Sequence, residues 1–146
     1  MTTESELPMA LRAAYLALHR RTDARFEPHG VTADQFVLLA TLARGGTLNQ
    51  RELARRMPSD PSTVRAMLVL LEKRGLVQRD RHPIDSRART VALTELGRRK
   101  VRQLWKAGKP IRSQMIESLQ SNEVETFVRL LRKVAASLNR ERVSAG

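Results

Sequence analysis

The sequence contains no cysteine and few aromatic residues. Among its 146 residues there are one Trp, one Tyr and three Phe. Without thiols, the chain has neither disulfide bonds nor a thiol redox sensor. No apolar run approaches the ~20 residues that a membrane-spanning helix needs, and Glu4 and Glu6 stand near the start, where a signal peptide carries basic residues. We therefore expect a soluble, cytoplasmic protein.

Motifs of catalysis are also lacking. The chain has no glycine-rich phosphate loop, no nucleophile motif and no recognisable pair of carboxylates for acid–base work. Its histidines, His19, His29 and His82, are scattered along the chain, whereas metal ligands come in clusters. We expect no enzymatic activity, no metal and no cofactor.

Acidic residues are in deficit, and the deficit is local. The chain has 27 basic and 15 acidic residues, a formal charge of +12. Residues 44–102 hold 15 basic and six acidic residues, whereas residues 1–43 hold four basic and five acidic ones. Of the basic residues 22 are Arg, whose planar guanidinium binds two acceptors at once. Genomic base composition also raises Arg content, but a local basic field attracts polyanions, either nucleic acid or an anionic membrane surface.

Helix start and stop signals divide the first half of the chain. Thr32 with Gln35 matches a capping box, and Asp60 before Pro61 is a strong N-terminal signal. Gly75 is a typical C-terminal stop. Together with the apolar spacing, these signals predict helices over residues 7–26, 32–45, 49–57 and 60–74. The last two, joined by a tight turn, form a helix-turn-helix.

A β-hairpin and two helices are predicted for the second half. Residues 76–79 and 90–93 read as strands on either side of a basic tip. The apolar stripe of the following helix passes Gly108 and Pro110 in phase, which predicts one kinked helix rather than two. Ser121 begins a final helix. The fold class is mostly α with a small β-hairpin wing, namely a winged helix-turn-helix (32–94) plus a helical dimerisation region (1–31 and 95–146), all in one structural domain.

The first and last helices carry apolar stripes too long for a winged module of this size. A helical core shared between two copies of the chain is the simplest way to bury them, so we expect a homodimer. An intramolecular bundle is the alternative that the sequence leaves open. Trp105 lies on the stripe of the long helix and is expected in the core.

Short motifs follow one another in a characteristic order. Leu53-Ala54 lies in the first helix of the turn, Gly75-Leu76-Val77 follows the second, and Asp85-x-Arg87 precedes Val91-x-Leu93-Thr94 and Gly97. This order, over nearly the whole chain, resembles the multiple antibiotic resistance regulator (MarR) family of transcriptional regulators. The resemblance implies a repressor that binds a palindromic operator as a dimer. In many members a small aromatic acid releases the DNA.

The second helix of the turn has one face for the core and one for DNA. Val64, Leu68 and Leu71 share the buried face, whereas Ser62, Thr63 and Arg65 lie off it near the helix start. The alternatives are a capping role for Ser62 and a merely solvated Arg65. The family resemblance assigns Arg87 to the minor groove, with Asp85 orienting it; the alternative is that both are ordinary turn residues. The expected DNA-binding residues are Ser62, Thr63, Arg65, Asp85, Arg87, Arg89, Arg81, Arg79 and Arg55.

An effector site is expected on the first helix. Tyr15 and His19 are four residues apart and share a face, which together with Arg20 or Arg44 would receive an aromatic carboxylate. Alternatively, Tyr15 belongs to the core and His19 is solvated. Val69 and Leu70 are apolar where members of the family usually carry polar residues, so we expect them beside the same cavity.

Two other classes of function share this fold. One is a winged-helix module that binds protein or RNA, which would not need both a basic recognition face and a basic wing tip. The other is a DNA-binding protein that responds to no effector.

Overall fold

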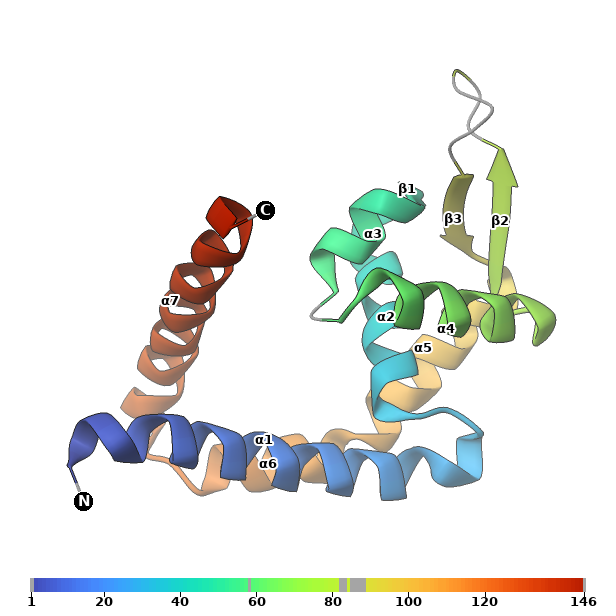
Figure 1. Cartoon of the computed structure of the whole chain (residues 1–146). Helices are drawn as coiled ribbons and strands as arrows, with labels where there is room; N and C mark the ends of the chain where they lie inside the picture. Colours follow the sequence, from blue (N-terminus) through green and yellow to red (C-terminus); the bar gives the residue numbers. More distant parts are fainter. Residues whose placement is uncertain (1, 58, 82–83, 85–88, 146) are drawn as a thin grey trace. The chain divides into compact units, whose positions relative to one another are not determined.

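The described part of the chain is mainly helical, with one small sheet. The computed structural model describes residues 2–57, 59–81, 84 and 89–145. Two compact units are present, 1–108 and 109–146. The first contains α1 (Thr3–Phe26), η1 (Glu27–His29), α2 (Ala33–Gly45), β1 (Leu48–Asn49), α3 (Gln50–Arg56), α4 (Pro61–Lys73), β2 (Val77–Arg81), β3 (Arg89–Leu93) and α5 (Glu95–Ala107), and the second contains α6 (Lys109–Glu117) and α7 (Ser121–Ala145) (Figure 1). No helix among the described residues is long and apolar enough to cross a membrane.

The helix starts read from capping signals are confirmed, whereas the first helix begins at Thr3 and not at Leu7. The hydroxyl of Thr32 accepts a hydrogen bond from the backbone N–H of Gln35, and the Gln35 side chain accepts one from the N–H of Thr32, so the capping box is complete. Asp60 caps α4 and Thr94 caps α5 through side-chain oxygens. These bonds satisfy N–H groups that the first helical turn leaves without a partner.

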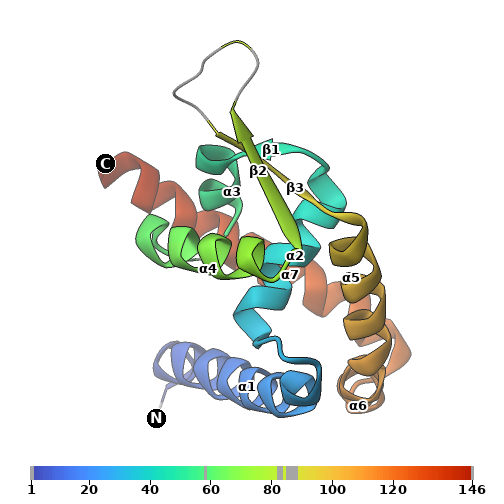
Figure 2. The same ribbon diagram turned by 90° about the vertical axis from the view of Figure 1, so that its right-hand side faces the viewer.

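The predicted hairpin is present, and a third strand joins it. The strand order is β1-β3-β2, all antiparallel, with Val77 opposite Leu93 and Arg81 opposite Arg89 (Figure 2). β1 pairs Leu48 with Val91. Sequence reasoning missed β1 because two residues are too few for the alternation that marks a strand.

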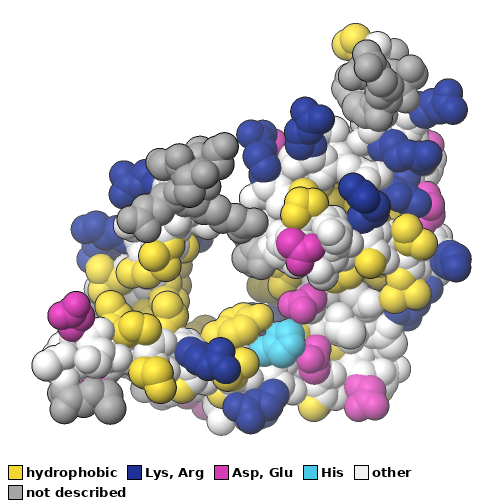
Figure 3. Space-filling model, viewed as in Figure 1, with side chains coloured by type: hydrophobic (Ala, Val, Ile, Leu, Met, Phe, Trp, Pro, Cys, Tyr) yellow, Lys and Arg dark blue, Asp and Glu magenta, His cyan; other side chains and the backbone are white. Residues whose placement is uncertain are grey.

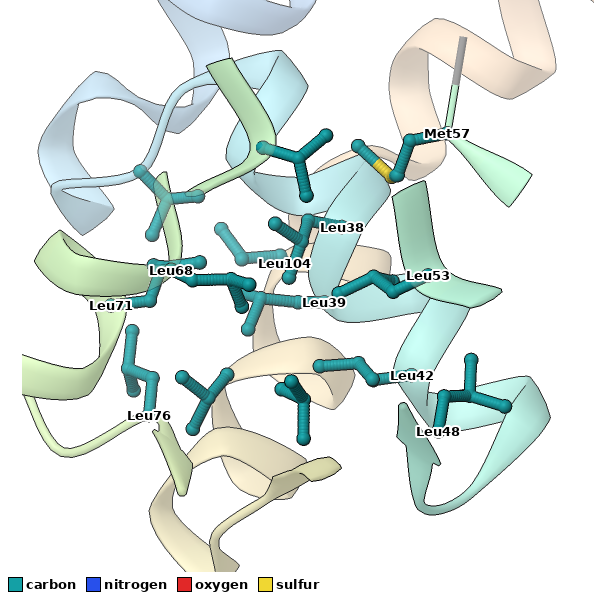
Figure 4. Close-up of a cluster of buried hydrophobic side chains, with 14 of the residues drawn as sticks. Leu38, Leu39, Leu42, Leu48, Leu53, Met57, Leu68, Leu71, Leu76 and Leu104 are labelled. Atoms are coloured by element: carbon teal, nitrogen blue, oxygen red, sulfur yellow. The ribbon is translucent and has the colours of Figure 1, made fainter. Parts of the chain in front are cut away.

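The core of the first unit surrounds α2. Leu38, Leu39 and Leu42 of this helix are at most 1% exposed. Leucines from α3, α4 and α5 close around them, together with residues of the sheet (Figure 4). These partners are Leu53, Leu68, Leu71, Leu76, Val77, Val91 and Leu104. The arrangement holds the two helices of the turn and the base of the hairpin on one apolar centre.

The prediction of a single kinked helix after Thr94 is wrong. α5 ends at Ala107 with Gly108 as its C-cap, and α6 begins at Lys109. The N–H of Gly108 still donates to Leu104, at 2.9 Å. Pro110 has no N–H to continue the ladder, and its ring fits the first turn of a new helix. The boundary between the two compact units falls at the same place.

The start of α5 packs tightly on the chain that leaves α4. Gly75 has a φ of +74°, the left-handed conformation that ends α4. The next residue, Leu76, approaches α5 so closely that a Cβ on Gly97 would lie 2.0 Å from the Leu76 carbonyl oxygen. That oxygen accepts the N–H of Thr94 at 3.1 Å. Only glycine at position 97 permits this contact.

Replacing Gly97 with Ala is expected to destabilise the fold by about 1–3 kcal/mol, the usual cost of forcing a methyl group into a packed site. Urea denaturation followed by circular dichroism measures the change. Gln103→Ala, on the exposed side of the same helix, is the control and should change stability by less than about 0.5 kcal/mol. Equal midpoints for Gly97→Ala and the wild type would contradict the close approach.

Candidate nucleic-acid interface

The N-terminal turn of α4 presents a polar, basic edge. Ser62 and Arg65 are exposed, whereas Val64 is buried. Asp60 accepts the backbone N–H of Thr63 at 2.9 Å and its hydroxyl at 2.8 Å. These two bonds, the backbone one foremost, lower the pKa of Asp60, so the cap stays ionised at neutral pH. The hydroxyl of Thr63 donates its proton to the carboxylate of Asp60. Ser62 and Arg65 are therefore the side chains of this turn that can reach a ligand.

Basic side chains of α3 lie near this edge but are partly neutralised. The carboxylate of Glu52 forms ion pairs with the guanidinium groups of both Arg55 and Arg56, the second at 3.0 Å. The two guanidinium groups, Arg55 first, lower the pKa of Glu52. The side chain of Arg55 nevertheless remains 75% exposed. It can therefore exchange its half-buried partner Glu52 for a phosphate at small cost, because ion pairs at the surface contribute little.

The base of the wing carries two cations in direct cross-strand register. Arg81 of β2 and Arg89 of β3 are opposite one another, and both are exposed. Like charges at such positions repel, and the repulsion falls when an anion lies between them. Further Lys and Arg side chains are scattered over the surface around α3, α4 and the hairpin (Figure 3). The expected contacts of Asp85 and Arg87 lie outside the described residues.

Arg79 is placed differently from its expected phosphate contact. Its side chain is only 15% exposed and forms an ion pair with Glu72 of α4, at 2.8 Å. The hydrogen bond from Arg79 is the main cause that lowers the pKa of Glu72. Arg79 therefore ties the hairpin to α4, and its guanidinium is engaged by Glu72 instead of facing outward. Sequence reasoning did not single out Glu72, although only the Gly75 turn separates it from Arg79.

A second tie joins α4 to the turn after α1. Arg74 donates from its guanidinium to the carbonyl of Gly30, and Lys100 of α5 donates to His29 at 3.4 Å. A Cβ on Gly30 would lie 2.7 Å from the Arg74 side chain. The residues in these two contacts are 44 and 71 positions apart in the sequence. A local sequence pattern therefore cannot predict them.

The residues expected to form an effector site are only partly brought together. Tyr15 and His19 are neighbours, with ring centroids 5.6 Å apart. His19 lies 3.2 Å from a carboxylate oxygen of Asp23 and 3.9 Å from one of Asp34. Two carboxylates at this place repel an anionic ligand.

The other residues expected at this site lie on α1, α2 and α4. Arg20 donates to the carbonyl of Leu16 on its own helix. Arg44 stands ten residues after Asp34 on α2, about 15 Å along the axis at 1.5 Å per residue. Val69 and Leu70 are exposed on α4, at 41% and 44%.

Trp105, expected in the core, is 51% exposed in the single chain. Its ring stacks on Phe36 with centroids 6.4 Å apart, and Phe36 meets Phe26 edge to face at 5.2 Å. One face of the indole therefore covers the core, and the rest lies at the surface.

The first unit carries both the exposed start of α4 and the hairpin of β2 and β3. A helix of this kind fits the major groove of B-DNA through its N-terminal residues, while the preceding helix crosses the backbone. A hairpin base with two exposed Arg residues suits the adjacent phosphates. The described residues hold no cluster of His, Cys, Asp and Glu able to bind a metal ion.

Comparison with known sequences gives a consistent result. The sequence profile of the MarR family matches residues 31–88. The chain is 28% identical over 131 residues to the HTH-type transcriptional repressor MdtR of Bacillus subtilis (strain 168), covering 90% of this chain and 84% of MdtR. It is 30% identical over 104 residues to the transcriptional regulator HosA of Escherichia coli O111:H-, covering 71% of this chain and 77% of HosA.

Solved structures agree with the sequence matches. A mutant of MarR from E. coli complexed with operator DNA superposes with a TM-score of 0.81 and 26% identity, covering 88% of this chain and 93% of that protein. BpsR of Bordetella bronchiseptica, whose DNA binding is regulated by 6-hydroxynicotinic acid, superposes with a TM-score of 0.83 and 27% identity, covering 92% and 96% of the two chains.

The ion pair between Glu72 and Arg79 predicts a pH-dependent effect on stability. The ordinary pKa of Glu72 is 4.5, and in the folded chain it is lower. The pair therefore adds stability above pH 4.5 and loses it as the pH falls through the folded-state value. Glu72→Gln should lower the melting temperature at neutral pH, with the gap to the wild type closing in acid.

Thermal melts from about pH 7 down to pH 3.5 measure this gap. Glu125→Gln, which changes an exposed carboxylate on α7, is the matched control and should track the wild type throughout. A gap that stays constant across the pH range would show that the loss comes from packing and not from the charge of Glu72.

Proposed function

Because the chain belongs to the MarR family of transcriptional regulators, we propose that it is a repressor that binds a palindromic DNA operator as a homodimer. The observation that carries the proposal is the pairing of an exposed, basic start of α4 with the exposed Arg81 and Arg89 of the hairpin on one rigid unit. MdtR is a repressor, and the MarR structure holds operator DNA. Members of the family are regulators and not enzymes.

In the proposed complex the contacts divide into two kinds. Arg65 reads a base edge in the major groove, and Ser62 supports it from the same turn. Arg55, Arg81 and Arg89 contact phosphates, which fix the position of the protein but carry no sequence information. Arg87, with Asp85 orienting it, enters the minor groove, where the negative potential is focused. Thr63 contributes through its cap, and Arg79 acts by positioning the wing.

The homodimer is supported by apolar faces that the single chain leaves exposed. On α7, Phe127, Val128 and Leu131 are 38–44% exposed although they recur at helical spacing. On α1, Leu7 and Tyr15 are more than half exposed. A soluble chain rarely leaves such contiguous apolar stripes in water, and a twofold interface buries them in pairs. Two copies then present two α4 helices to a palindrome.

We further propose that a small aromatic acid lowers the affinity for the operator. BpsR supports this by analogy, because its DNA binding is regulated by 6-hydroxynicotinic acid. Tyr15, His19, Arg20, Arg44, Val69 and Leu70 remain the sequence-based candidates for the contacts. A protein-binding or RNA-binding winged helix is disfavoured, because neither needs cations at both the helix start and the hairpin base.

Changing Arg65 to Ala is expected to relax the preference at one base pair per half-site by about 1–3 kcal/mol. Fluorescence anisotropy on a panel of operator variants, taken from the DNA beside the gene, measures the preference. Lys73→Ala, at the far end of α4, should leave the preference unchanged. Equal losses of affinity on every variant would remove the base-reading role from Arg65.

Introducing a charge into the α7 stripe is expected to separate the copies. Leu131→Glu should convert a dimer into a monomer at micromolar concentration. Operator binding should then weaken strongly, because each monomer contacts only one half-site. Sedimentation velocity measures the mass. Arg129→Ser, an exposed neighbour, is the control and should stay dimeric. A wild type that sediments as a monomer at the same concentration contradicts the proposal.

A further inference from the structure

One face of α4 carries short side chains between two polar ends. Ser62, Ala66, Val69 and Lys73 are all exposed, and they follow one another at intervals of four, three and four residues. Side chains at this spacing lie on the same face of a helix. The buried face lies opposite and consists of Val64, Leu68 and Leu71. The four exposed residues therefore form the outermost strip of α4, here called the outer strip.

The middle of the outer strip is apolar. Ala66 is exposed, and Val69 is 41% exposed. Valine is among the weaker helix formers, because its branched side chain loses rotamer freedom in a helix. At an exposed position it neither favours the helix nor completes the core, whereas a long polar residue such as Lys73, one turn later, suits water. A valine at position 69 therefore indicates a partner that buries it.

The neighbours of α4 fix the direction in which Val69 faces. Glu72, three residues after Val69, forms its ion pair with Arg79 of the hairpin. Arg65, four residues before Val69, is exposed on the same side of the helix. Val69 therefore lies between the side chain expected to read a base and the part of α4 that holds the hairpin.

Leu70, the other large apolar residue exposed on α4, faces a different way. Arg74, four residues after Leu70, donates to the carbonyl of Gly30 in the turn after α1. The flank of α4 that carries Leu70 is therefore directed to that turn, and the flank that carries Val69 is directed to the hairpin. Of the two, Val69 is the one continuous with the proposed DNA-binding surface.

We propose that Ala66 and Val69 of the outer strip contact the 5-methyl groups of thymine in the major groove. Each operator half-site then carries T·A pairs beside the pair that Arg65 reads. This inference rests on the proposed function and names the bases that the same surface selects. The thymine methyl group points into the major groove, and apolar contact with it is one form of direct readout. Val69 is then a DNA contact and not part of an effector site.

The geometry of α4 suits this division of contacts. The short side chains of Ala66 and Val69 let the helix approach the base edges closely, whereas the longer Arg65 reaches guanine acceptors from the flank. Arg65 and Val69 are about 6 Å apart along the helix, at about 1.5 Å per residue. With about 3.4 Å between successive base pairs, the thymines lie within about two base pairs of the pair that Arg65 reads.

Operator duplexes with deoxyuridine in place of thymidine test the contact, because uracil lacks only the 5-methyl group and pairs as thymine does. The Arg65→Ala profile first locates the base pair that Arg65 reads. Thymines within about two base pairs of it are then replaced, one symmetric pair at a time. Each methyl group removed should raise the dissociation constant of the wild type about four-fold in fluorescence anisotropy, the effect of exposing one buried CH₂-sized group. Replacement of thymines outside the half-sites should have no effect.

A variant at position 69 assigns the methyl contact to its residue. Val69→Ser removes both methyl groups of the side chain with little change in helix propensity. It should weaken binding to the thymine operator and lose the sensitivity to uracil at the position nearest to Val69. Val37→Ser, the same change at a valine of α2 that is 39% exposed, is the matched control and should keep the full sensitivity. Circular dichroism verifies that both variants fold.

Two results would overturn the inference. One is a wild type that binds thymine and uracil operators equally at every position. The other is a Val69→Ser variant with the same sensitivity to uracil as the wild type, which places the methyl contact on another residue. If the chain binds no duplex at all, the proposed function fails and the thymine contact fails with it, whereas duplex binding that ignores uracil overturns the thymine contact alone.

Discussion

The ion pair between Glu72 and Arg79 is the interaction on which the proposed DNA-binding surface depends. It joins the last turn of α4 to the first strand of the hairpin, across the tight turn at Gly75. It adds to the apolar contacts by which Val77 and Val91 of the hairpin base pack into the core. The ion pair helps to keep the start of α4 and the base of the hairpin at a constant distance from each other. Binding to the regularly spaced grooves of a DNA duplex requires such a constant distance. In the proposed complex, the largely buried Arg79 therefore positions the hairpin through Glu72 rather than binding DNA itself.

Local signals predicted the elements of this surface and failed where contacts are distant. Asp60, Pro61 and Gly75 marked α4 correctly, because capping and left-handed turns depend on a few adjacent residues. The role of Arg79 was not predictable in the same way. A basic residue on a hairpin looks the same in sequence whether it faces phosphate or a carboxylate seven positions away. The break at Gly108 was missed since the apolar stripe continues in phase through Pro110.

The candidate effector residues show the same limit. Helical spacing placed Tyr15 beside His19 correctly. It could not show that the carboxylates of Asp23 and Asp34 lie beside the imidazole of His19. The electrostatics of a site come from several elements at once, and one helical stripe reveals only its own side chains. The excess of Arg, in contrast, was readable from composition, and exposed Arg residues lie on α3, α4 and the hairpin as well as on α1, α5 and α7.

The central claim, that α4 faces the DNA, is tested most directly by cleavage of bound DNA from a tethered iron chelate. Because the chain has no cysteine, a single introduced thiol carries the chelate uniquely. From Ala66→Cys on α4 the account predicts cuts at two positions symmetric about the operator centre, and from Gln103→Cys on α5 it predicts none. Cuts from position 103 with none from position 66 would contradict it.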